Sequence, residues 1–172
     1  SKSGIDVLSV DAGKTTLLLK TGGTFYTAEV PHDQTSGELT AVTRFSINTT
    51  GVSLTTGAVL DVTGWTWQDC GYHDGRLYVP VCKGASTVVA VYSILNEDGT
   101  VKSGALSPDK DCSIQIGDVN HRVVEVESCA VYDGKLYFNA NRTLPDGGKD
   151  CDCVAWTALP PAPVIEKPDE NP

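Results

Sequence analysis

The stretch CGYHDGRLYV at residues 70–79 recurs at residues 129–138 as CAVYDGKLYF. Both copies carry a cysteine, an Asp-Gly pair, a basic residue, a leucine and a tyrosine at matching places. Asp-Gly between two apolar runs supplies the positive φ angles of a tight hairpin turn, so each copy predicts a pair of antiparallel strands. A weaker copy, VDAGKTTLL at residues 10–18, indicates a third unit.

A further apolar strand is expected after each copy, at residues 39–47, 89–95 and 153–159. In the middle unit, alternation places Leu77, Val79 and Val81 on one face and Tyr78 and Cys82 on the other. The strand that follows is apolar on both faces, with Val88, Ala90, Tyr92 and Ile94 on one and Val89 and Val91 on the other. Two apolar faces predict a sheet that is covered on both sides, as in the blades of a propeller.

The sequence therefore predicts an all-β domain over residues 1–159, built from three repeated, propeller-blade-like antiparallel units at about 5–62, 63–121 and 122–159. The alternatives are a β-sandwich and a trefoil-like barrel. Pro80 indicates that its strand is an edge strand or contains a bulge. Residues 96–119 are expected to form a loop or an extra strand. No segment holds a helical period for three turns, so no helix is predicted. Residues 160–172 are proline-rich and acidic, which is typical of a linker or tail.

The composition narrows the classes of partner. The formal net charge of −9 argues against nucleic acid and against docking on anionic membranes, and no apolar run is long enough to insert into a bilayer. The six cysteines follow no common zinc spacing, so we expect disulfides in an oxidising, extracellular setting, with buried free thiols as the alternative. The disulfide candidates are Cys70, Cys82, Cys112, Cys129, Cys151 and Cys153.

Candidate ligand-binding residues cluster between positions 65 and 73. Trp65 and Trp67 alternate, so they share one strand face, where flat rings could stack on sugars; the alternative is that they fill the core. Tyr72 and His73 stand beside a predicted hairpin tip, where ligands often bind, and Asp69 could add polar contacts.

Other polar residues predict no site. His121 is interpreted as a surface residue of a polar loop, and no metal or cofactor is predicted, although loop aspartates could hold a structural calcium ion. None of these aspartates forms a calcium-binding loop of the EF-hand pattern. The loop aspartates are Asp109, Asp111, Asp118, Asp146, Asp150 and Asp152.

The pattern CGYHDGRLYVPV…VVAVYSI followed by VESCAVYDGKLYFNA resembles the receptor-binding propeller domains of bacteriophage tail proteins, over residues 65–159. The resemblance implies binding of a cell-surface polymer, often a glycan or teichoic acid. Catalytic motifs are missing from the sequence. We therefore expect a non-catalytic, extracellular binding or structural module of a phage tail or bacterial surface, secreted or on a virion or cell surface.

The expected partner is a cell-surface polysaccharide or a protein, and a homo-oligomer is compatible with the sequence. The first alternative is a self-assembling structural subunit with no small ligand. The second is a carbohydrate-active hydrolase, since a glycosidase needs only two suitably spaced carboxylates and the chain has 22 acidic residues.

Overall fold

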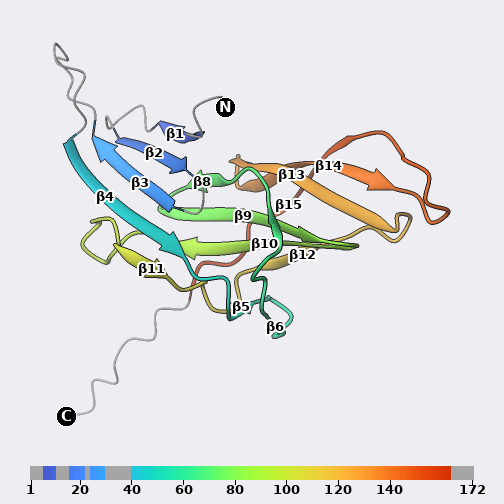
Figure 1. Cartoon of the computed structure of the whole chain (residues 1–172), viewed down its shortest axis with the longest axis horizontal. Coiled ribbons are helices and arrows are strands. Elements are labelled where there is room, and N and C mark those ends of the chain that lie inside the picture. The colour runs from blue at the N-terminus through green and yellow to red at the C-terminus, as the bar shows by residue number, and fades with distance from the viewer. Residues whose placement is uncertain (1–5, 11–15, 22–23, 30–39, 164–172) are drawn as a thin grey trace.

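The computed structural model describes residues 6–10, 16–21, 24–29 and 40–163, and these are all-β (Figure 1). Several mainly antiparallel sheets account for the strands, and the described residues include no helix. No membrane-spanning helix is therefore found in this part of the chain. The predicted fold class is confirmed at this level. The division into three blade-like units is not, and the turn of the weakest copy, at residues 11–15, lies outside the described residues.

The first sheet contains five strands in the order β1-β2-β3-β4-β11. All neighbours are antiparallel except β11, which runs parallel to β4. Stacked rings of Phe25 and Phe45, 5.2 Å apart at their centroids, are buried on one face of this sheet. The strands are β1 (Asp6–Val10), β2 (Thr16–Thr21), β3 (Thr24–Glu29), β4 (Thr40–Ile47) and β11 (Gly104–Leu106).

The middle sheet has the order β12-β10-β9-β7, and β8 also pairs with β9. Two strands of the predicted loop region, β11 and β12, thus join different sheets. The middle strands are β7 (Thr66–Trp67), β8 (Gly71–His73), β9 (Arg76–Lys83), β10 (Ser86–Ser93) and β12 (Ile114–Ile116). The strands β5 (Val52–Ser53) and β6 (Val59–Leu60) form a separate two-stranded ribbon.

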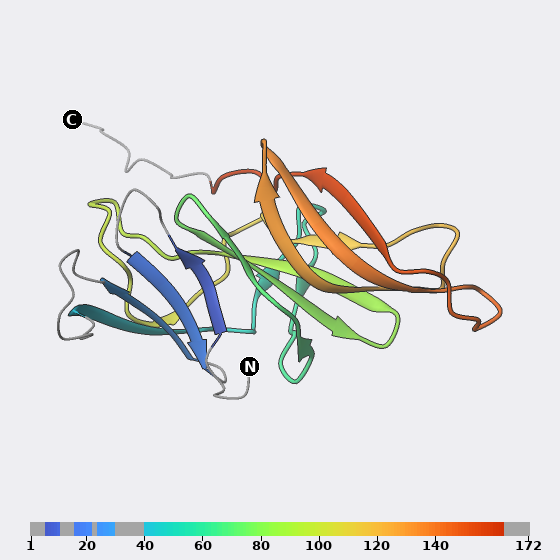
Figure 2. The ribbon, with the colours of Figure 1, turned by 90° about the horizontal axis from the view of Figure 1, so that it is seen from above.

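The third sheet is an antiparallel meander, β13-β14-β15. Its strands are β13 (Val123–Tyr132), β14 (Lys135–Thr143) and β15 (Cys153–Ala158). Figure 2 shows this sheet and the first sheet on opposite sides of the middle strands.

Each face of the middle sheet contributes to a separate hydrophobic core, as the alternation predicts. One core contains Leu77, Val79 and Val81 of β9 together with alternate residues of β10. The other contains Tyr78 of β9, Val89 and Val91 of β10, and the inner face of the third sheet. Burial on both faces explains why the centre of β10, residues 88–92, is apolar.

The two Asp-Gly pairs form the predicted hairpin turns. Asp74 and Gly75 have φ angles of 47° and 74°, and Asp133 and Gly134 have 46° and 69°. Two positive φ angles in succession are typical of a type I′ turn, whose twist matches that of the flanking strands. Gly75 also lies against the core, since a Cβ there would come within 2.7 Å of a methyl group of Leu95.

Pro80 does not mark an edge strand, because β9 lies inside its sheet. Its partner on one side is Val89 of β10. On the other side the neighbouring strand is interrupted, since β7 ends at Trp67 and β8 begins at Gly71. The missing N–H of proline falls at that gap, where the carbonyl of Pro80 still accepts a hydrogen bond from the backbone N–H of Gln68 at 3.0 Å.

Candidate functional site

The outer face of the third sheet exposes large apolar side chains. The inner residues of β14, Leu136, Phe138 and Ala140, are buried, so the residues between them point away from the core. On this outer face Tyr132 is 74% exposed and Trp156 is 57% exposed. Of the three tryptophans, Trp65 and Trp67 pack against the first core, whereas Trp156 packs against neither core of the described residues.

The strand register brings three aromatic residues together. Tyr137 of β14 lies directly opposite Trp156 of β15. The rings of Tyr137 and Tyr132 are 6.5 Å apart at their centroids and tilted by 57°. Since cross-strand neighbours on one face lie within contact distance, the three rings form a stripe across the sheet. We call Tyr132, Tyr137 and Trp156 the aromatic platform.

Lys135 adds a positive charge to the aromatic platform. Its Nζ lies 4.2 Å from the ring centroid of Trp156. In the strand register Lys135 is opposite Tyr132 of β13 on one side and Ala158 of β15 on the other. A cation over an indole face is attracted by the ring quadrupole, which steadies the orientation of the tryptophan.

Polar side chains continue the same face beyond the platform. Asn139 follows Tyr137 two residues along β14, and its Oδ1 accepts a hydrogen bond from the Ser128 hydroxyl at 2.5 Å. The Nδ2 of Asn141 donates to the carboxylate of Glu127 at 2.6 Å. The amides can both donate hydrogen bonds to the hydroxyl groups of a ligand and accept them, and the carboxylate can accept them.

The five predicted ligand residues do not form such a platform. Trp65, Trp67 and Tyr72 are half-buried and pack against the first core, which is the alternative considered for the two tryptophans. His73 is exposed at the end of β8. Asp69 is exposed too, and its backbone N–H donates to the carbonyl of Glu127 at 3.1 Å, which joins the middle and third sheets.

The sequence carried one signal for the aromatic platform. Alternation sets Tyr137 on the face opposite Leu136 and Phe138, and Trp156 occupies the next strand. Which face of that strand is exposed depends on the neighbouring sheets, so alternation alone does not separate Trp156 from a core residue.

The six cysteines are free thiols in the structure, so the expected disulfides are not supported. Cys70, Cys82, Cys112 and Cys129 are buried, where a thiol packs as a small apolar group. Burial raises the pKa of the Cys129 thiol to about 12. Only Cys151 is exposed, and a guanidinium nitrogen of Arg142 donates to its Sγ at 3.2 Å.

His121 is a buried connector between two loops, whereas the sequence suggested a surface residue. Its side chain is 7% exposed and its two ring nitrogens lie 3.1 Å from a carboxylate oxygen of Asp118 and 2.8 Å from one of Asp150. The hydrogen bond with His121 is the largest of the effects that lower the pKa of Asp150, to about 2. The described residues contain no cluster of three or more side chains suited to a metal ion.

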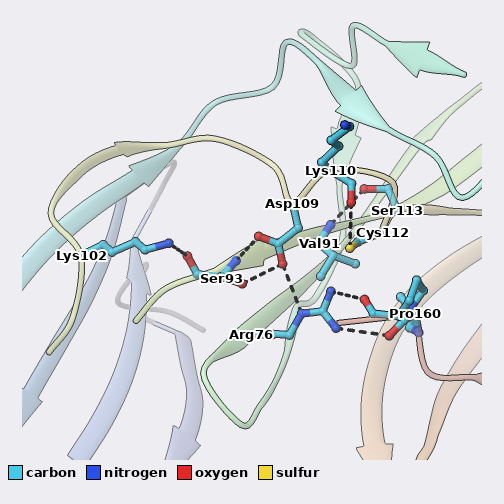
Figure 3. A network of polar contacts seen from close by, with 10 residues as sticks. Arg76, Val91, Ser93, Lys102, Asp109, Lys110, Cys112, Ser113 and Pro160 are labelled. Atoms are coloured by element: carbon cyan, nitrogen blue, oxygen red, sulfur yellow. Dashed lines mark hydrogen bonds and ion pairs between the residues drawn. The ribbon is translucent and has the colours of Figure 1, made fainter. Parts of the chain in front are cut away.

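A second polar network holds the end of the described chain (Figure 3). The Nε of Arg76 donates to Asp109 at 3.2 Å, and its other two nitrogens donate to the carbonyls of Pro160 and Pro161 at 3.2 and 2.9 Å. Asp109 also accepts from the backbone N–H and the hydroxyl of Ser93. Arg76 donates to one carboxylate and to two backbone carbonyls in this network. The network therefore fixes the path of the chain after β15.

Comparisons with protein-family models, with curated proteins and with solved structures found no match. The geometry of the chain itself is therefore the basis for a functional proposal. Among the described residues, the outer face of the third sheet brings the exposed rings of Tyr132 and Trp156 together with a lysine and with amide side chains.

Proposed function

We propose that the protein is a non-catalytic binding module of an extracellular assembly, on a phage tail or a bacterial surface, and that it holds cell-surface glycan on the aromatic platform. Tyr132, Tyr137 and Trp156 make the apolar contacts in this proposal. The site therefore moves from the predicted tryptophan pair, Trp65 and Trp67, to the outer face of the third sheet.

The observation that carries the proposal is the gathering of three neighbouring rings on the outer face of the third sheet, where Tyr132 and Trp156 are exposed and Tyr137 is half-buried. Exposed large apolar groups that are contiguous, and rimmed by polar residues, are typical of interaction surfaces. Tyr132 and Trp156 come from the two strands on either side of Tyr137, so the gathering of the three rings is a property of the sheet register. A ring in the interior would contribute to stability instead, as Trp67 does where it packs against the first core.

A sugar is complementary to this surface through its apolar ring face and through its hydroxyl groups. A pyranose ring presents an apolar face of C–H groups, which can pack on an aromatic ring, and a rim of hydroxyl groups. Asn139, Asn141 and Glu127 supply donors and acceptors for such a rim. Nucleic-acid bases also stack on aromatic rings, but the net charge of −9 repels their phosphate backbone.

We also propose that the middle and third sheets are related units of blade type. The support is that both start with a hairpin closed by Asp-Gly with positive φ angles at both turn residues. The leucine after each turn, Leu77 or Leu136, is fully buried. In both, the strand after the turn pairs antiparallel with the next long strand, β10 or β15.

The test is a glycan array followed by calorimetry with the best ligand. Replacing Trp156 or Tyr137 by alanine is expected to weaken binding by about 1–3 kcal/mol each, the range of a central aromatic contact, which is about 5-fold to 150-fold in Kd. Val59→Ala is the matched control, because Val59 is exposed on the separate β5–β6 ribbon. The proposal fails if no glycan binds, or if Trp67→Ala weakens binding while Trp156→Ala leaves it unchanged.

A further inference from the structure

Strand β15 forms one edge of the third sheet, and within the described chain no strand pairs with its outer side. In Figure 2 it is the red strand on the outer side of that sheet. Its side chains on the outer face, Val154 and Trp156, are well exposed.

The hairpin turn determines which backbone groups point to this edge. In a two-residue type I′ hairpin the flanking residues, here Tyr132 and Lys135, exchange hydrogen bonds with each other. Successive residues of an antiparallel strand turn their N–H and C=O groups to opposite sides, so those of Leu136 point to Thr157 of β15. On β15 the groups that point to the open edge are then those of Val154, Trp156 and Ala158.

The usual protection of an edge strand is missing here. Natural edges carry charged residues, prolines or bulges that prevent pairing with another chain. The sequence of β15, CVAWTA, contains no charge and no proline, and its register with β14 is unbroken. Directly after the strand, Arg76 binds the carbonyls of Pro160 and Pro161, which directs the chain toward β9 (Figure 3).

We propose that β15 pairs antiparallel with β15 of a second copy of the chain, about a two-fold axis at Trp156. The three residues whose backbone groups point to the open edge are placed symmetrically about Trp156. Trp156 therefore pairs with Trp156 of the second copy, and Val154 of each copy pairs with Ala158 of the other. About six backbone hydrogen bonds would form, two for each pair of facing residues. The two three-stranded sheets become one sheet of six strands.

A second copy fits this edge better than a charged partner. Every side chain at the contact is uncharged, so pairing places no like charges directly opposite one another. The chain as a whole carries −9, which opposes the approach of two copies at low ionic strength. A contact of one strand from each copy is also small, so the dimer is expected to be concentration-dependent and strengthened by salt.

Dimerisation would double the binding surface, a consequence that rests on the proposed function. The two aromatic platforms would lie on one continuous face with the two copies of Trp156 side by side. A polysaccharide that spans both would dissociate more slowly than from a single platform, because the second contact forms within the complex.

Sedimentation equilibrium over a range of concentrations, at low salt and at about 0.5 M salt, tests the proposal. The wild type is expected to dimerise more strongly at high salt. Val154→Lys puts charges at the contact, and Ala158→Pro removes an N–H of the open edge while keeping the bonds to β14; each is expected to weaken dimerisation at least 10-fold. Val59→Lys, with the same change of charge at an exposed valine of another sheet, is expected to leave it unchanged.

A cross-link tests the register. Trp156→Cys in a Cys151→Ser background is expected to form a disulfide-linked dimer under mild oxidation, because facing residues of such a pair lie about 5.5 Å apart. Val59→Cys in the same background is the control. A wild type that is monomeric at every concentration and salt, or a Val154→Lys variant that dimerises as well as the wild type, would overturn the proposal. Dimers that bind no glycan would leave this pairing intact and refute only the proposed function.

Discussion

Replacing Asp109 by alanine is expected to destabilise the fold by about 3–5 kcal/mol, the usual cost of removing one partner of a buried ion pair. The carboxylate of Asp109 is almost fully buried and accepts hydrogen bonds from Arg76 at 3.2 Å and from the N–H and hydroxyl of Ser93 at 2.9 and 2.8 Å. Without it, the N–H of Ser93 loses its partner. Arg76 still donates to the carbonyls of Pro160 and Pro161, so its charge is not left without acceptors. The expected cost is therefore near the lower end of that range.

Urea unfolding followed by tryptophan fluorescence measures this effect. With an m-value of about 2 kcal/mol/M, the midpoint of unfolding should fall by about 1.5–2 M. Asp109→Asn is expected to be intermediate, since an amide can still accept from Ser93 but does not neutralise Arg76. The matched control is Asp152→Ala, because Asp152 is an exposed carboxylate of the loop that precedes β15.

The reasoning is refuted if Asp109→Ala and Asp152→Ala shift the midpoint equally. It is refuted too if Asp109→Ala leaves residues 160–163 as resistant to protease as in the wild type while unfolding remains unchanged. Either result would mean that the network in Figure 3 carries no net stability.

Three further measurements follow from the structure. Gly75→Ala is expected to be more destabilising than Gly134→Ala, because both strain a positive φ angle by about 1 kcal/mol but only position 75 also meets the core; equal unfolding midpoints would contradict this. The pKa of Asp150 is lowered from 3.8 to about 2, so the contribution of its carboxylate to stability is present above pH 3.8 and is lost as the pH falls through about 2. The difference in unfolding midpoint between the wild type and Asp150→Asn should therefore vanish over that pH range. A difference that does not change with pH would refute this prediction. In native protein a thiol reagent is expected to modify Cys151 first and the four buried cysteines only on unfolding, and rapid reaction of four or more thiols would count against the described burial.

Local alternation was sufficient to predict β9 and β10, the two long strands of the middle sheet. The faces expected for Leu77, Val79 and Val81, and for the apolar residues of β10, are those observed, because the buried centre of a strand that is covered on both sides is apolar on both faces. The Asp-Gly turns were predictable for a similar reason, since glycine and aspartate tolerate the positive φ angles at positions 75 and 134 and their neighbours.

The candidate site could not be predicted in the same way. Trp67 and Trp156 both lie in short strands, yet one packs against a core and the other is exposed. Their difference arises from the layers around them. Trp67 lies opposite Val81 of the doubly covered middle sheet, whereas Trp156 lies on the outer face of the last sheet.

The same distinction applies to Pro80 and His121. A proline in a strand is compatible with an edge, a bulge or a gap in the neighbouring strand, and only the positions of β7 and β8 select the gap. His121 meets Asp150 across 29 residues of sequence, a pairing that no local pattern reveals.

The sequence by itself determined the all-β class, the hairpin turns and the two apolar faces of β10, because these depend on the backbone preferences and side-chain alternation of a few neighbouring residues. Only the tertiary structure decided which sheet is covered, which aromatic rings reach the surface and which strand edge stays open. Those properties depend on how distant strands pack against one another, and a strand face carries no local mark of whether another layer will cover it.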